Sequence, residues 1–194
     1  MADQKISAMP NAAALTGSEL VPLVQSGANV KSTLSNLQAF HRAYGAFSDN
    51  VDQIGSVSAG TALQCNSTDI ADGITVVSNT QFTVPNDGKY NLQFSAQLKN
   101  VGNTQEDATI WFRINGVDVP NSATQITVPA RKSASIFGYA VAAWNIMLNM
   151  TAGEYVEIIW LPTSTTVTVE ALPSNASPAY PAIPSIIVTM QQVA

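Results

Sequence analysis

The sequence has 194 residues, 46% of them hydrophobic and only 11% charged, with a formal net charge of −5. Average soluble domains carry roughly 25% charged residues, so uncharged polar side chains must cover much of this surface. The negative charge argues against nucleic acid as a partner, because such binding depends on neutralising phosphates, and no apolar stretch reaches the roughly 20 residues of a membrane-inserted helix.

Residues 1–40 contain small residues, two prolines and short apolar runs, with no aromatic residue before Phe40. Their pattern predicts a hairpin with strands at 19–25 and 30–33, in which Pro22 favours an edge position. The segment is too small to form a core, so we expect an extended arm that lies either against its own trimer or against a larger surface. The apolar side chains expected to anchor this arm are Ile6, Leu15, Leu20, Val21, Leu23 and Val24.

Residues 41–194 form the second predicted domain, made of short strands separated by turns. The clearest strand is 89–99, in which every second residue is apolar. Such a strand has one apolar face, which a second layer must cover. The apolar positions are Tyr90, Leu92, Phe94, Ala96 and Leu98.

The other strands follow from hydrophobic patterning and from turn residues. They are predicted at 44–54, 61–65, 74–77, 81–84, 108–115, 117–119, 123–128, 133–150, 154–161, 165–171 and 186–190. Asn115-Gly116 predicts a tight hairpin, the segment 69–73 a turn, and 154–161 a strand buried on both faces, where Trp160 joins the core. About eight to ten antiparallel strands predict an all-β sandwich, jelly roll or barrel.

Few side chains in the sequence could support catalysis. His41 is the only histidine and Cys65 the only cysteine, so a catalytic triad or a zinc site lacks partners. We expect Cys65 to be a small buried residue and the protein to be non-enzymatic, with no cofactor. Three pairs of carboxylates could bind Ca²⁺, but without an ordered ligand loop we expect solvated turns. These pairs are Asp49/Asp52, Asp69/Asp72 and Glu106/Asp107.

Four blocks occur in order within residues 44–194: FTVPNDGKYNLQFSAQL, ATIWFRINGVDVP, LNMTAGEYVEIIW and IPSIIVTMQQV. They resemble the tumour-necrosis-factor and complement-globular-head family. This resemblance implies a ten-strand jelly-roll sandwich that assembles as a homotrimer around an apolar axis. Trp111, on the polar face of its strand, could contact a trimer partner or form a platform for sugar stacking, and we favour the first. By position, the trimer interface is assigned to Tyr90, Phe94, Trp111, Tyr155 and Ile187.

The stretch KISAMPNAAALTGSELVPLVQSGANVKSTLSNL resembles the leader of tailed-bacteriophage fibre and virion-surface proteins, with Met9 and Leu23 in place of the usual Leu and Val. The resemblance implies a virion-surface protein made in the host bacterial cytoplasm. Only residues 38–45 separate this leader from the predicted jelly roll of residues 41–194, which we call the knob. Such a short connection favours a capsid decoration or head-fibre protein that is bound to the major capsid protein through residues 1–40. The alternative is a short tail fibre, held by a tail or adaptor protein, that recognises a host surface glycan.

Overall fold

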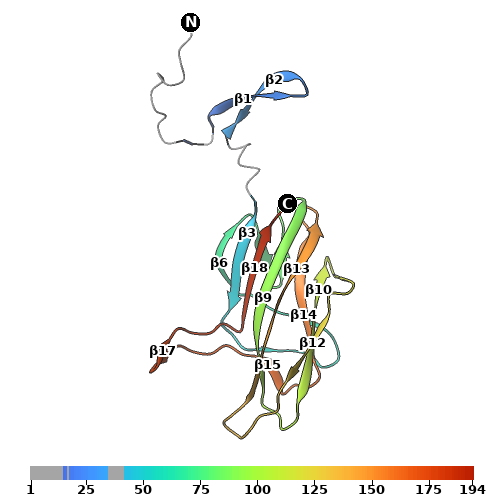
Figure 1. Ribbon diagram of the computed structural model, residues 1–194, viewed down its shortest axis with the longest axis vertical. Helices are drawn as coiled ribbons and strands as arrows, with labels where there is room; N and C mark the ends of the chain where they lie inside the picture. The colour runs from blue at the N-terminus through green and yellow to red at the C-terminus, as the bar shows by residue number, and fades with distance from the viewer. Residues whose placement is uncertain (1–14, 17, 35–41) are drawn as a thin grey trace. The chain divides into compact units, whose positions relative to one another are not determined.

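The computed structural model describes residues 15–16, 18–34 and 42–194 (Figure 1). The chain divides into two compact units, Met1–Arg42 and Ala43–Ala194, and its sheets are antiparallel throughout. The predicted all-β class is therefore confirmed. The anchor candidate Ile6 and the single histidine, His41, lie outside the described residues.

The first unit contains one hairpin, formed by β1 (Leu20–Gln25) and β2 (Ala28–Thr33). Ser26 and Gly27 connect the strands with φ angles of 51° and 79°. Two consecutive positive φ angles are typical of the tight turn whose twist matches that of the flanking strands. The hairpin predicted in this segment is therefore confirmed, and Pro22 lies in a strand whose described pairing is with β2 alone.

The second unit consists of two seven-stranded sheets, which we name after their central strands. The β9 sheet contains β4 (Gln53–Ile54), β15 (Val167–Val169), β9 (Gly88–Asn100), β18 (Ile186–Gln192), β3 (Tyr44–Asp49), β6 (Ser67–Asp72) and β13 (Gly138–Met150). The β14 sheet contains β11 (Val117–Asp118), β10 (Glu106–Ile114), β14 (Tyr155–Pro162), β8 (Gln81–Thr83), β7 (Thr75–Val77), β12 (Thr124–Val128) and β5 (Thr61–Ala62). A separate small hairpin is formed by β16 (Asn175–Ala176) and β17 (Ala179–Tyr180).

Strand β9 organises its sheet, as the sequence predicts. All 13 of its residues pair with β13 along one edge, while the other edge pairs with β18 and then with β15. Its five alternating apolar side chains are buried, and the residues between them face the opposite side. The period of two thus fixes one face of the sheet as core.

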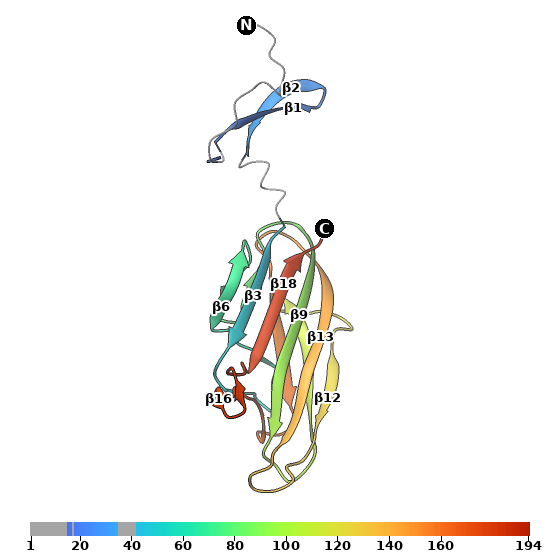
Figure 2. The same ribbon diagram turned by 60° about the vertical axis from the view of Figure 1, so that its left-hand side comes forward.

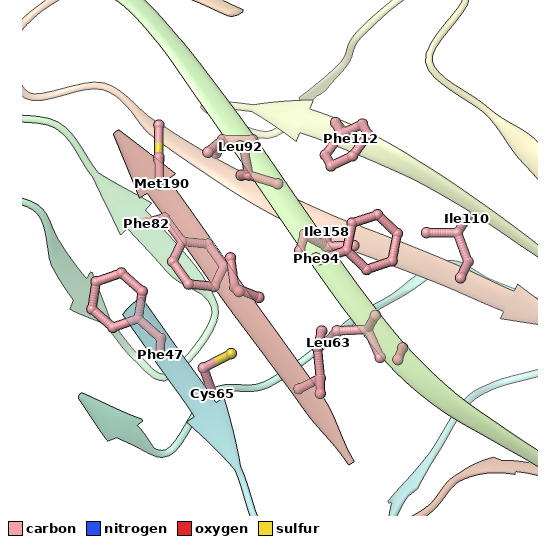
Figure 3. Close-up of a cluster of buried hydrophobic side chains, with 14 of the residues drawn as sticks. Phe47, Leu63, Cys65, Phe82, Leu92, Phe94, Ile110, Phe112, Ile158 and Met190 are labelled. Atoms are coloured by element: carbon pink, nitrogen blue, oxygen red, sulfur yellow. The ribbon is translucent and has the colours of Figure 1, made fainter. Parts of the chain in front are cut away.

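The core lies between the two sheets, with aromatic contacts that cross from one sheet to the other (Figure 3). The ring centroids of Phe47 and Phe82 are 5.4 Å apart, and those of Phe94 and Phe112 are 5.9 Å apart in an edge-to-face arrangement. Trp160 is fully buried in the same core, as predicted. These contacts identify the second unit as a β-sandwich with a core of its own.

Three segments differ from the sequence-based prediction. Residues 67–72 form strand β6 where a turn was expected, because this exposed, polar edge strand is held by backbone pairing to β3 and shows no apolar period. Strand β13 starts at Gly138, and 133–136 forms only an isolated bridge. A Cβ atom at Gly138 would lie 1.8 Å from the Pro129 carbonyl oxygen, so this strand start requires glycine. Residues 172–184, where no strand was predicted, contain β16 and β17.

Replacing Phe94 with Ala should destabilise the single subunit by about 3–5 kcal/mol, because the ring fills the space between Phe112 and Trp144. Urea unfolding monitored by far-UV circular dichroism measures this change. Val117→Ala, at an exposed hairpin, is the control and should change the free energy by less than about 0.5 kcal/mol. Equal effects of the two substitutions would contradict the core placement.

Candidate functional site

Cys65 is the only thiol of the chain, and it is buried with 3% of its surface exposed. Burial raises its pKa to about 12, and the negative charges of Asp49 and Asp69 add to this effect. Thiol nucleophiles react as thiolates, which this environment strongly disfavours near neutral pH. The predicted burial of Cys65 is confirmed, and its chemistry is that of a small apolar residue.

A buried polar cluster next to Cys65 is fully used by structural hydrogen bonds. The Asp49 carboxylate accepts hydrogen bonds from the Val51 backbone N–H at 2.9 Å and from Gln53 Nε2 at 3.1 Å. Ser185 Oγ donates to the Asp49 backbone oxygen, and Gln53 Oε1 accepts from the Gln64 N–H. The pKa of Asp49 is raised by burial, against the lowering effect of backbone hydrogen bonds. These bonds tie the end of β3 to the start of β18.

The carboxylate pairs considered for Ca²⁺ likewise have partners within the protein. Asp107 accepts hydrogen bonds from Gln125 and Thr127, and Glu106 accepts one from Thr163. Within the described ranges, no three His, Cys, Asp or Glu side chains converge as ligands for a metal ion.

The outer faces of the two sheets differ in charge. On the β14 sheet, Arg113 and Asp118 form an ion pair at 2.9 Å, and Asp107 and Glu157 also point outward. The N–H groups of Trp111 and then Arg113 lower the pKa of Asp118. This face carries the charges expected of a surface in contact with water.

The outer face of the β9 sheet has no charged side chain at its centre. Uncharged polar and small residues of β9, β18 and β13 occupy it, and Ile187 is 42% exposed there. Charges are confined to its margins. The central residues are Asn91, Gln93, Ser95, Ala143, Asn145, Ile187 and Thr189, and the marginal charges are Lys89, Lys99, Asp69 and Asp72.

Shallow hollows cross this uncharged face from β3 to β13. One, of about 260 Å³, lies between Tyr44, Ile70 and Gln93, and the next, of about 200 Å³, lies beside Ile187. Gln93 also borders a third hollow, next to Ala143. The hollows adjoin one another around Gln93 and form a surface that a protein partner could fill.

Strand β13 extends this face to the edge of the sheet. In the described part of the chain it pairs with β9 alone, and none of its 13 residues is charged. Tyr139, Val141 and Met147 are exposed on its outer side. Long edge strands usually carry charges or proline that prevent further association, and β13 has neither.

The five residues assigned to the trimer interface do not share one surface. Tyr90 and Phe94 point into the core, so neither side chain can reach a second copy; the Tyr90 hydroxyl donates to the Asn86 carbonyl. Trp111 and Tyr155 lie on the outer side of the β14 sheet, and the Trp111 indole packs against Gly60. Only Ile187 lies on the uncharged face of the β9 sheet.

The resemblance assigned these five residues to strands, but it did not give the direction of each side chain. The apolar side of a strand packs into the subunit's own core, which explains why Tyr90 and Phe94 point inward. The signal that points to the uncharged face was present in the alternate residues of 89–99 and in the charge-free run 138–150.

The five anchor candidates within the described residues lie in or next to the hairpin of the first unit. Leu15, Leu20 and Val24 are exposed, with 60%, 57% and 68% of their surface accessible to solvent. Val21 and Leu23 are half-buried. Two strands alone are marginally stable in water, and this hairpin exposes apolar side chains besides.

No family model matches the chain, and no curated protein shows a significant similarity to it. Among the described residues, no helix has the length and hydropathy required to cross a membrane.

Between pH 9 and 12, Cys65 should make stability fall as the pH rises. The unfolded thiol ionises above 9.0, while the folded thiol retains its proton up to about 12. The unfolded state therefore binds fewer protons, and the free energy of unfolding decreases by up to about 1.4 kcal/mol per pH unit. Urea unfolding from pH 8 to pH 10.5 measures the slope. Cys65→Ala should show a shallower slope, and an identical slope would contradict the assignment.

Proposed function

We propose that this chain is a non-enzymatic structural protein of the tailed-bacteriophage virion surface, a homotrimeric jelly roll attached to the particle by residues 1–40. The main observation in support of this proposal is the outer face of the β9 sheet, which is uncharged and hollowed and lies beside an edge strand without charges. Charge is depleted in the core of subunit interfaces, so such a face suits contact between copies.

The strand order supports the jelly-roll assignment. In the β9 sheet, β3 and β18, the first and last long strands of this unit, are neighbours, and β9 and β13 follow. The facing sheet has the order β7, β8, β14, β10, with β12 beside β10. Sequence-distant strands thus lie side by side within two packed sheets, as in double-sheet jelly rolls.

The first unit supports the anchoring role. Its hairpin exposes Leu20 and Val24 and has too little apolar surface for a core. Docking on a larger protein surface would remove these side chains from water and order the hairpin at the same time. Shared burial across neighbouring capsid subunits would then stabilise the shell by mass action.

Removing residues 1–36 should leave a folded knob that no longer binds phage heads. The remaining unit keeps its own core, so its circular dichroism spectrum should remain that of a β-protein and its number of subunits should match that of the full chain. Co-sedimentation with purified heads lacking this protein measures binding, with the full-length chain as the positive control. Truncated protein that still sedimented with heads would contradict the anchor assignment, and full-length protein found only at tails would indicate the fibre alternative.

Replacing Thr189 with Lys should dissociate the trimer, because it places an unpaired charge at the centre of the uncharged face. Analytical ultracentrifugation should show the monomer at concentrations where the unmodified protein is trimeric. Thr75→Lys is the matched control, since Thr75 is an exposed strand residue of the β14 sheet. An unchanged mass for the Thr189 variant would place the interface elsewhere.

A further inference from the structure

The hairpin between β15 and β18 is a defined element that projects from the sandwich. At its base, Leu172 and Ile183 exchange two backbone hydrogen bonds of 2.9 and 2.8 Å. Above the base, Asn175 pairs with Tyr180 and Ala176 with Ala179. Figure 1 shows this hairpin extending away from both sheets.

The hairpin makes little use of its side chains within the subunit. None of residues 172–183 is buried, and none is charged. Tyr180 is 44% exposed near the tip, among alanine, proline and serine. Strands of two residues cannot hold such a projection in water by themselves. An ordered, apolar and uncharged projection therefore suits burial against another molecule.

The direction of the projection places it beside the uncharged face. In Figure 2, the β9 sheet is seen face-on, with β16 just below the lower end of β3. In Figure 1, the hairpin extends to the left. The turn of 60° brings that side forward, so in Figure 2 the hairpin extends toward the viewer. The hairpin thus stands out from the side of the sheet that carries the hollows around Gln93.

The foot of the hairpin is fixed by a largely buried ion pair. Glu170, two residues before Leu172, pairs through Oε1 with Lys99, whose ammonium lies 4.4 Å from the centre of the Phe137 ring. The pair neutralises a charge at this end of the face. The Glu170 carboxylate also interacts with Tyr139, whose pKa is raised by burial and by this negative charge.

We propose that the hairpin 172–183 is a clamp that seats on the uncharged β9-sheet face of a second copy of this chain. This inference rests on the self-association proposed above and assigns a segment to it. The projection and the hollowed face are different surfaces of one chain, so each copy can present its hairpin to the next. Contacts between unlike surfaces form a closed ring when the rotation permits, and a trimer is such a ring.

Photo-crosslinking from position 180 tests the placement. Tyr180→p-benzoylphenylalanine is prepared in an equal mixture of ¹⁵N-labelled and unlabelled full-length protein. We expect mixed-label peptide pairs that join position 180 to residues 91–95 or 187–191. Val117→p-benzoylphenylalanine, on an exposed hairpin of the β14 sheet, is the control and should give no such pairs. Exclusively intramolecular products from position 180 would overturn the proposal.

Shortening the hairpin tests its contribution to assembly. Replacing residues 173–182 with Asn-Gly keeps the pairing of Leu172 with Ile183 and closes it with a tight turn. Sedimentation should show at least a tenfold weaker association, with an unchanged circular dichroism spectrum. A full-length protein that is monomeric at every concentration would overturn the proposed trimer and the clamp together. Trimers unaffected by the shortening would overturn the clamp alone, and so would a loss of adsorption to host cells with the trimer intact.

Discussion

The alternation of side chains along β9 is the constraint on which the second unit depends. One face of this strand supplies Tyr90, Leu92 and Phe94 to the core, and the other face presents uncharged polar residues. Because β9 pairs with β13, β15 and β18, its register fixes which side chains of these strands face inward. A shift of one residue would expose the core side chains and bury lysines and amides. The same alternation therefore specifies both the fold and the character of the outer face.

The distribution of charge follows from this division. A sandwich has two outer faces, and a chain with 11% charged residues cannot cover both of them with charges. Here the β14 sheet carries Asp107, Arg113 and Glu157 outward, whereas the centre of the β9 sheet carries none. Sparse overall charge could equally describe a monomer with an evenly polar surface. The charged side chains are instead segregated onto one of the two faces, and this favours self-association over an evenly polar monomer.

Much of the fold could be predicted from the sequence wherever local chemistry alone decides the structure. Asn115-Gly116 adopts positive φ angles of 48° and 81°, as its turn requires, and β14 is buried on both faces, where Ile159 and Trp160 are successive residues. Strand β6 could not be predicted, because an exposed edge strand is specified by its neighbour's backbone and not by its own period. The inward direction of Tyr90 and Phe94 could not be predicted for a related reason. Similarity assigns positions to strands, whereas the direction of a side chain depends on which layer covers that face.

The hairpins β1–β2 and β16–β17 pose the same physical problem. The pair β1–β2 exposes Leu20 and Val24, and the pair β16–β17 exposes Tyr180; among the described residues of each unit, no second layer covers these side chains. Ordering such segments costs conformational entropy that their few hydrogen bonds do not offset. Binding supplies the missing burial, so the stability of each hairpin is coupled to the occupancy of its partner surface. If one hairpin seats on the particle and the other on a neighbouring copy, assembly and attachment reinforce each other, because a trimer holds the particle through three anchors at once.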